Sequence, residues 1–280
     1  MRHEFLLLSA ASLALTLVAC KPAASVDSEE SSLAESESSA TQDTLDVSEA
    51  SAATASFAPS SSNAVAGCTV TRDVLATATA CSQSYDSSVK VSWSCTGPNG
   101  GTAQGTANVA TAVVPDACPP STYAISQTIG LDRTRTHGEY SGNLTGTSVV
   151  SWNVAPAAQV ATKQVSLQLE HKVTKNGNLV RHQTLDGAKT VDLAGNGAGP
   201  ADDTRTVNGS VDVKFLLAGD ELNVTESNLV WHRDCCYPLA GSLSFVKSGN
   251  ATGEGSITFG PSCGEAVNAQ GDSLNLADCN

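Results

Sequence analysis

Residues 163–191, KQVSLQLEHKVTKNGNLVRHQTLDGAKTV, decide the fold class of this chain. Apolar and polar side chains alternate up to residue 174, which is the pattern of a half-buried strand. Asn176-Gly177 follows, and a second run returns over 179–191. Asn-Gly between two such runs predicts a hairpin, because both central residues of a type I′ turn take positive φ. The side chains expected on the apolar face of the first strand are Val165, Leu167, Leu169, His171 and Val173.

The same alternation extends over most of the chain beyond residue 62. Val, Thr, Ser and Gly are abundant there, helical periodicity is scarce, and the gaps between runs are short and rich in turn residues. This pattern favours an all-β fold, an antiparallel meander forming a curved sheet, a sandwich or a partial barrel. Further strands are expected over 69–80, 88–94, 103–114, 123–129, 147–154, 211–217, 220–231, 241–246 and 255–259.

Charge argues against one class of function. The 280 residues include 28 acidic and 15 basic side chains, a formal net charge of −13. A nucleic-acid binder that tracks phosphates needs a basic surface, so we expect no nucleic-acid partner.

The first twenty residues carry an export signal. Arg2 and His3 precede an apolar run over 5–19, which is short for a membrane span and typical of a signal peptide. The run ends in Leu17-Val18-Ala19-Cys20, and this segment resembles the lipobox of bacterial lipoproteins. The resemblance implies cleavage after Ala19, lipid on the Cys20 sulfur and an acylated new terminus. It places the protein in the bacterial cell envelope, anchored to the membrane. The residue after Cys20 is Lys21 and not Asp, which favours the outer membrane over the inner membrane, with the protein facing the periplasm or the cell surface.

The chain then divides into a tether and a folded part. Residues 20–62 are rich in Ser, Ala and Glu, and from 22 to 62 the segment has eight carboxylates but no Lys or Arg. Such a composition buries too little apolar area to offset the entropy of ordering, so we expect a disordered, extended acidic linker. Residues 63–280 should form the β domain, as one unit or as two with a seam near residue 156.

Eight cysteines remain after Cys20 is assigned to lipid: Cys68, Cys81, Cys95, Cys118, Cys235, Cys236, Cys263 and Cys279. An even number in an oxidising compartment predicts four disulfides. If the first two strands form a hairpin, Cys68 lies beside Cys95, and Cys81 lies at the opposite end near Cys118. Cys235 and Cys236 point to opposite faces of an extended chain, so we expect them to bond separately to Cys263 and Cys279.

The sequence offers no assembled chemistry. It contains no G-x-S-x-G, H-E-x-x-H or G-x-x-x-x-G-K motif, and the cysteine spacings do not suit zinc. We therefore predict no catalytic residues, no metal and no cofactor. Trp93, Trp152 and Trp231 lie in strand-like runs and should fill the core. The carboxylates of Glu139, Glu221 and Glu226 are expected in solvent.

These observations lead to a functional hypothesis with two alternatives. Residues 235–279 loosely resemble the end of uncharacterised β-rich envelope lipoproteins, a likeness that brings no known activity. The leading hypothesis is a lipid-anchored envelope lipoprotein with a non-enzymatic structural or interaction role. A small-ligand-binding β module with an apolar cavity is one alternative. A periplasmic or surface hydrolase, whose acid and base meet only in three dimensions, is the other.

Overall fold

The computed structural model describes the strands of the β domain and a few residues outside them. The described residues are Leu33, 68–96, 101–155, 162–194, 204–232, 237–274 and 276. The lipobox, most of the predicted linker, and Cys235, Cys236 and Cys279 lie outside these ranges.

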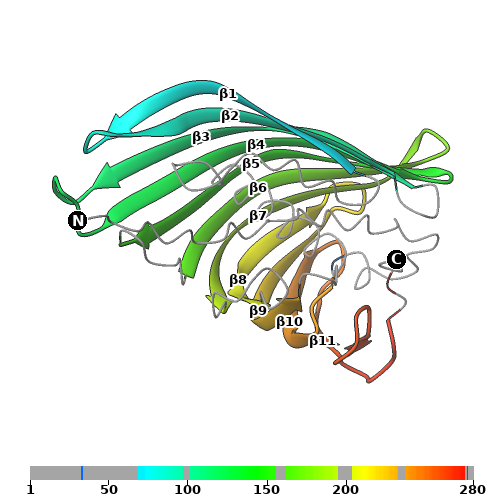
Figure 1. Cartoon of the computed structure of the whole chain (residues 1–280). Coiled ribbons are helices and arrows are strands. Elements are labelled where there is room, and N and C mark those ends of the chain that lie inside the picture. Colours follow the sequence, from blue (N-terminus) through cyan, green and yellow to red (C-terminus); the bar gives the residue numbers. More distant parts are fainter. Residues whose placement is uncertain are drawn as a thin grey trace.

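Twelve strands form one antiparallel meander in which each strand pairs with the next along the chain (Figure 1). The all-β prediction is confirmed, and of the three forms expected it is the single curved sheet. The strands are β1 (Cys68–Ala80), β2 (Gln83–Thr96), β3 (Thr102–Pro115), β4 (Tyr123–His137), β5 (Tyr140–Val154), β6 (Thr162–Lys175), β7 (Asn178–Ala194), β8 (Thr204–Phe215), β9 (Asp220–His232), β10 (Ala240–Gly249), β11 (Gly253–Phe259) and β12 (Ala266–Asn268).

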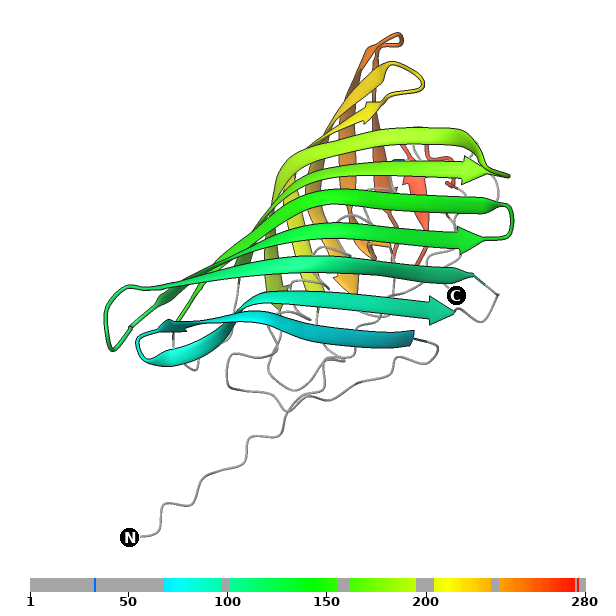
Figure 2. The same cartoon turned by 90° about the horizontal axis from the view of Figure 1, so that it is seen from above.

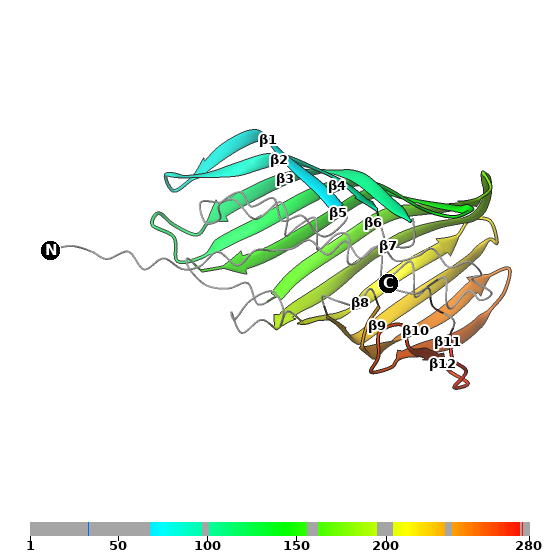
Figure 3. The ribbon, with the colours of Figure 1, turned by 45° about the vertical axis from the view of Figure 1, so that its right-hand side comes forward.

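The sheet is open and strongly curved. Its order runs from β1 to β12, and these two end strands are not neighbours in the sheet. Seen from above, β8–β11 cross the direction of β1–β7, so that the strand direction turns along the sheet (Figure 2). Figure 3 shows the curved sheet in a turned view, and we call its concave side the trough. The accumulated right-handed twist of so many strands accounts for this shape.

One face of the sheet is buried and forms the core. Val165, Leu167 and Leu169 are at most 3% exposed, whereas the intervening Ser166 and Gln168 are exposed. Successive side chains point to opposite faces of the sheet. Because a curved sheet brings together the side chains on its concave side and spreads apart those on its convex side, we infer that the buried face is the concave one. A single apolar cluster on it extends from β2 to β12, and it includes the three tryptophans as predicted.

The hairpin that decides the fold class has the expected geometry. β6 and β7 pair from Lys175↔Asn178 inward, and Asn176 and Gly177 have φ values of 51° and 79°. Both lie in the left-handed region that a type I′ turn requires.

Several strands are longer than their alternation predicts. β4 was expected to end at residue 129 but continues to His137, and β5 begins at Tyr140 instead of 147. Arg133 is only 3% exposed, and it lies on the concave face, opposite Leu144. A charged side chain at an inward position breaks the apolar alternation, so the pattern stops short of the true strand end.

The sheet also continues on both sides of residue 156, near which the two-unit alternative would place a seam. Residue 156 itself lies outside the described residues, but the strands on either side of it, β5 and β6, pair from Ser151↔Gln164 to Tyr140↔Lys175. The two halves therefore share one sheet and one core.

Candidate functional site

A disulfide joins the first and the third connections of the meander, which lie at the same end of the sheet. Cys81 lies in the β1–β2 turn and Cys118 in the β3–β4 connection, and their Cα atoms are 5.4 Å apart across the bond. This pair confirms the predicted proximity of the two cysteines. Cys81 and the following Ser82 have φ values of 46° and 67°, a left-handed turn built without glycine. The disulfide ties this turn to its neighbouring connection.

The other cysteines are placed only in part. The Cα atoms of Cys68 and Cys95 are direct partners in the β1–β2 ladder, and Cys95 is disulfide-bonded. Cys263 is also disulfide-bonded. Among the described residues, no three His, Cys, Asp or Glu side chains are grouped so that they could hold a metal ion.

A buried ion pair lies at the centre of the sheet and corrects the expectation for Glu226. Lys189 Nζ on β7 donates to Glu226 Oε1 on β9 at 2.7 Å, and both side chains are 0% exposed. Glu226 follows Leu222 and Val224 at two-residue intervals, so it shares their concave face. This two-residue spacing was the signal in the sequence that placed it inward.

The intervening strand makes room for this contact. Gly209 on β8 is the Cα partner of both Lys189 and Glu226. A Cβ at Gly209 would lie 2.5 Å from the Ala188 carbonyl oxygen and 3.0 Å from Lys189 Cγ. The absence of a side chain here lets the ammonium reach across one strand to its carboxylate.

A second cluster of polar side chains on the concave face is centred on His171. His171 lies between Leu144 on β5 and Gln183 on β7, in the apolar register predicted for it. Burial first, and then the positive charges of Arg133, Arg181 and Arg135, together lower the pKa of the imidazole to about 3. His171 is therefore neutral at physiological pH.

This lowered pKa predicts a specific pH dependence of stability. Between pH 6.5 and 3 the unfolded chain binds a proton at residue 171 that the folded chain does not, so the free energy of unfolding falls as pH falls through this window. The slope from one such group reaches at most about 1.4 kcal/mol per pH unit. We expect His171→Gln to flatten the slope measured by urea unfolding at pH 3.5 to 7. An unchanged slope in that variant would contradict the assignment.

His182, Glu139 and Glu221 do not converge on one site. His182 Nε2 lies 2.6 Å from Glu170 Oε1 on the convex face. His171, the residue after Glu170 in β6, points to the opposite face, into the trough. Glu221 forms a solvent-exposed pair with Lys214, and Glu139 lies 3.9 Å from Lys175 and is 60% exposed. Glu139 and Glu221 are thus in solvent, as expected.

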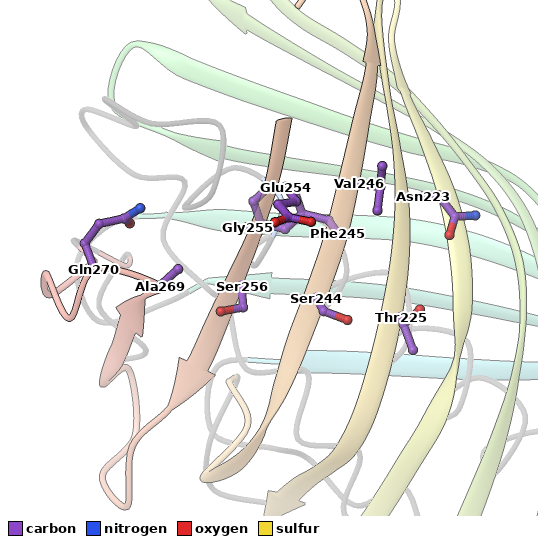
Figure 4. A pocket seen from close by; sticks show the side chains of 10 residues that line it. All are labelled: Asn223, Thr225, Ser244, Phe245, Val246, Glu254, Gly255, Ser256, Ala269 and Gln270. Atoms are coloured by element: carbon purple, nitrogen blue, oxygen red, sulfur yellow. The ribbon is translucent and has the colours of Figure 1, made fainter. Parts of the chain in front are cut away.

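A shallow hollow of about 490 Å³ lies on β9, β10 and β11, beside the turn that follows β12 (Figure 4). Asn223, Thr225, Ser244 and Ser256 contribute polar side chains from the convex face. The Phe245 ring packs over Gly255, where a Cβ would lie 2.3 Å from the ring. Glu254 is the one ionisable side chain among the lining residues, so the hollow offers no acid and base together.

Comparison with known proteins adds no family to this picture. No protein-family model matches the chain, and neither a curated protein nor a solved structure is similar enough to count as a match. Over the described residues, no helix is both long enough and apolar enough to cross a membrane.

Proposed function

We propose that this protein is a lipid-anchored lipoprotein of the bacterial cell envelope with a non-enzymatic structural or interaction role. The observation that carries the proposal is the tetrapeptide Leu17-Val18-Ala19-Cys20 at the end of an apolar run of about signal-peptide length. Acylation at the sulfur and at the new terminus supplies more than one acyl chain. Two acyl chains hold a protein stably at the membrane, whereas one does not.

Two features of the folded part support a non-enzymatic role over the alternatives. A hydrolase needs an acid and a base that face one substrate, whereas the hollow on β9–β11 has a single carboxylate, from Glu254. A module for apolar ligands needs an enclosed apolar cavity, whereas this hollow is shallow and open, and polar side chains line it beside apolar ones. An extended, disulfide-braced sheet instead presents a broad surface to a macromolecular neighbour.

The anchor is tested by replacing the sulfur. We expect Cys20→Ser to abolish labelling by a palmitate analogue, to retain the leader and to remove the lipid mass from the membrane-extracted protein. Lys21→Ala, one residue away, should keep both the label and the mature mass. If Cys20→Ser still loses its leader normally and sediments with vesicles, the proposal is wrong.

A further inference from the structure

The concave face carries more cations than carboxylates. On this face eight Lys and Arg residues of the described strands have a buried apolar residue as a Cα partner. They are Arg72, Arg133, Arg135, Lys163, Arg181, Lys189, Arg205 and Lys247. Three carboxylates of the strands meet them: Asp86, Asp220 and Glu226. The strands alone therefore leave this face strongly positive.

The three carboxylates are already engaged by three of the cations. Arg72 lies 2.6 Å from Asp86, Lys247 lies 3.0 Å from Asp220, and Lys189 holds Glu226. The other five cations are not isolated, since each makes an interaction within the folded chain. Lys163, for example, is 5% exposed and places its Nζ 5.3 Å from the centre of the Trp152 ring. Burying so many like charges is costly unless negative charge enters the same space.

A residue from the acidic segment lies in this core. Leu33 belongs to no strand, yet it is 0% exposed and belongs to the apolar cluster of the concave face. In the sequence, four carboxylates lie within four residues of it: Glu29, Glu30, Glu35 and Glu37. An apolar side chain from the most acidic part of the chain is thus buried against the most basic face of the sheet.

We propose that residues 27–49 dock along the concave face as the second layer of the domain, with Leu33 as the apolar anchor. The eight carboxylates of this segment, which has no Lys or Arg, then neutralise the excess cations of the trough. Ionic contacts shielded from water are stronger than those of an exposed linker, and Leu33 adds apolar burial.

The docked segment shortens the tether that the composition predicts. In combination with the proposed lipid on Cys20, only the twelve residues 21–32 separate the membrane anchor from Leu33. Fully extended, they span at most roughly 45 Å. The sheet is then held close to the membrane surface instead of at the end of a long spacer.

A Glu-specific protease tests the docking on the full chain. We expect slow cleavage after residues 29–49 in the native protein and cleavage at least tenfold faster in Leu33→Asp. The matched control is Phe57→Asp, which adds the same charge to the acidic stretch outside the docked residues and should leave the rate unchanged. Native protein cleaved there as fast as an unfolded peptide, or equal acceleration by both variants, would overturn the proposal.

A second variant separates loss of docking from loss of folding. Replacing Glu29, Glu30, Glu35 and Glu37 together with Gln leaves Leu33 and every strand residue unchanged. We expect this variant to retain its β-sheet circular dichroism while hydrogen exchange over 27–49 becomes at least tenfold faster. Unchanged exchange would overturn the role of charge. Exchange that is already fast in the native protein would mean that another occupant covers the face, and would also overturn the proposal.

Discussion

Glu226→Gln is expected to destabilise the protein by about 3–5 kcal/mol, the cost of removing one partner of a buried ion pair. The carboxylate lies 2.7 Å from Lys189 Nζ, and both side chains are fully buried. In the variant the ammonium keeps its desolvation cost but loses the negative charge that lies 2.7 Å away. Chemical denaturation, followed by the tryptophan fluorescence of the core, measures the loss.

The same strand offers a matched control for this prediction. Glu221 on β9 also pairs with a lysine, at 3.4 Å from Lys214, but both side chains are about half exposed. Exposed pairs contribute about 0–1 kcal/mol, so Glu221→Gln should change stability little. The double variant Lys189→Met, Glu226→Leu removes both buried charges and should recover most of the stability lost in Glu226→Gln. Equal losses in Glu221→Gln and Glu226→Gln would contradict this account.

Gly146→Ala is expected to cost about 2–5 kcal/mol, because both backbone strain and overpacking act at this position. Gly146 lies within β5 with a φ of 143°, which L residues rarely adopt. An added Cβ would lie 2.2 Å from the Gln168 carbonyl oxygen and 2.8 Å from the Leu169 Cα. Both atoms belong to the backbone of β6, so relief requires the strands to separate. The midpoint of thermal unfolding should fall accordingly.

The control for this glycine lies one strand away. Gly130 on β4 is adjacent in the ladder, and a Cβ there would meet only the Asn108 carbonyl oxygen, at 3.9 Å. Gly130→Ala should leave the midpoint unchanged or raise it slightly, since alanine loses less conformational entropy on folding than glycine. A Gly146→Ala variant as stable as Gly130→Ala would show that β5 and β6 do not approach as closely as described.

The alternating pattern was enough to predict the class of fold and its central hairpin. Val165, Leu167 and Leu169 lie on the buried face, and Asn176-Gly177 makes the turn, because side-chain period and turn conformation are local properties of the chain. The proximity of Cys81 and Cys118 followed from the same strand order.

The partners of polar residues on the concave face could not be assigned in this way. Three charged side chains occupy inward positions: Arg133, Lys189 and Glu226. In the sequence, a charged residue at such a position predicts the end of a strand or a side chain in solvent. Such a residue is stabilised only by partners from distant strands, and sequence spacing does not show which partners meet. The same holds for Leu33, whose local composition predicts a linker and whose side chain is nevertheless fully buried.

Local periodicity thus specified strands, turns and the inward face, since each depends on neighbours two to four residues away. Which of three β architectures results, how far the sheet curves and which charges meet inside it were decided only by contacts between residues far apart in the chain. Lys189 and Glu226, thirty-seven residues apart and joined over Gly209, are the clearest instance. Their pairing depends on three strands lying side by side in register, and no single segment of the sequence specifies that register.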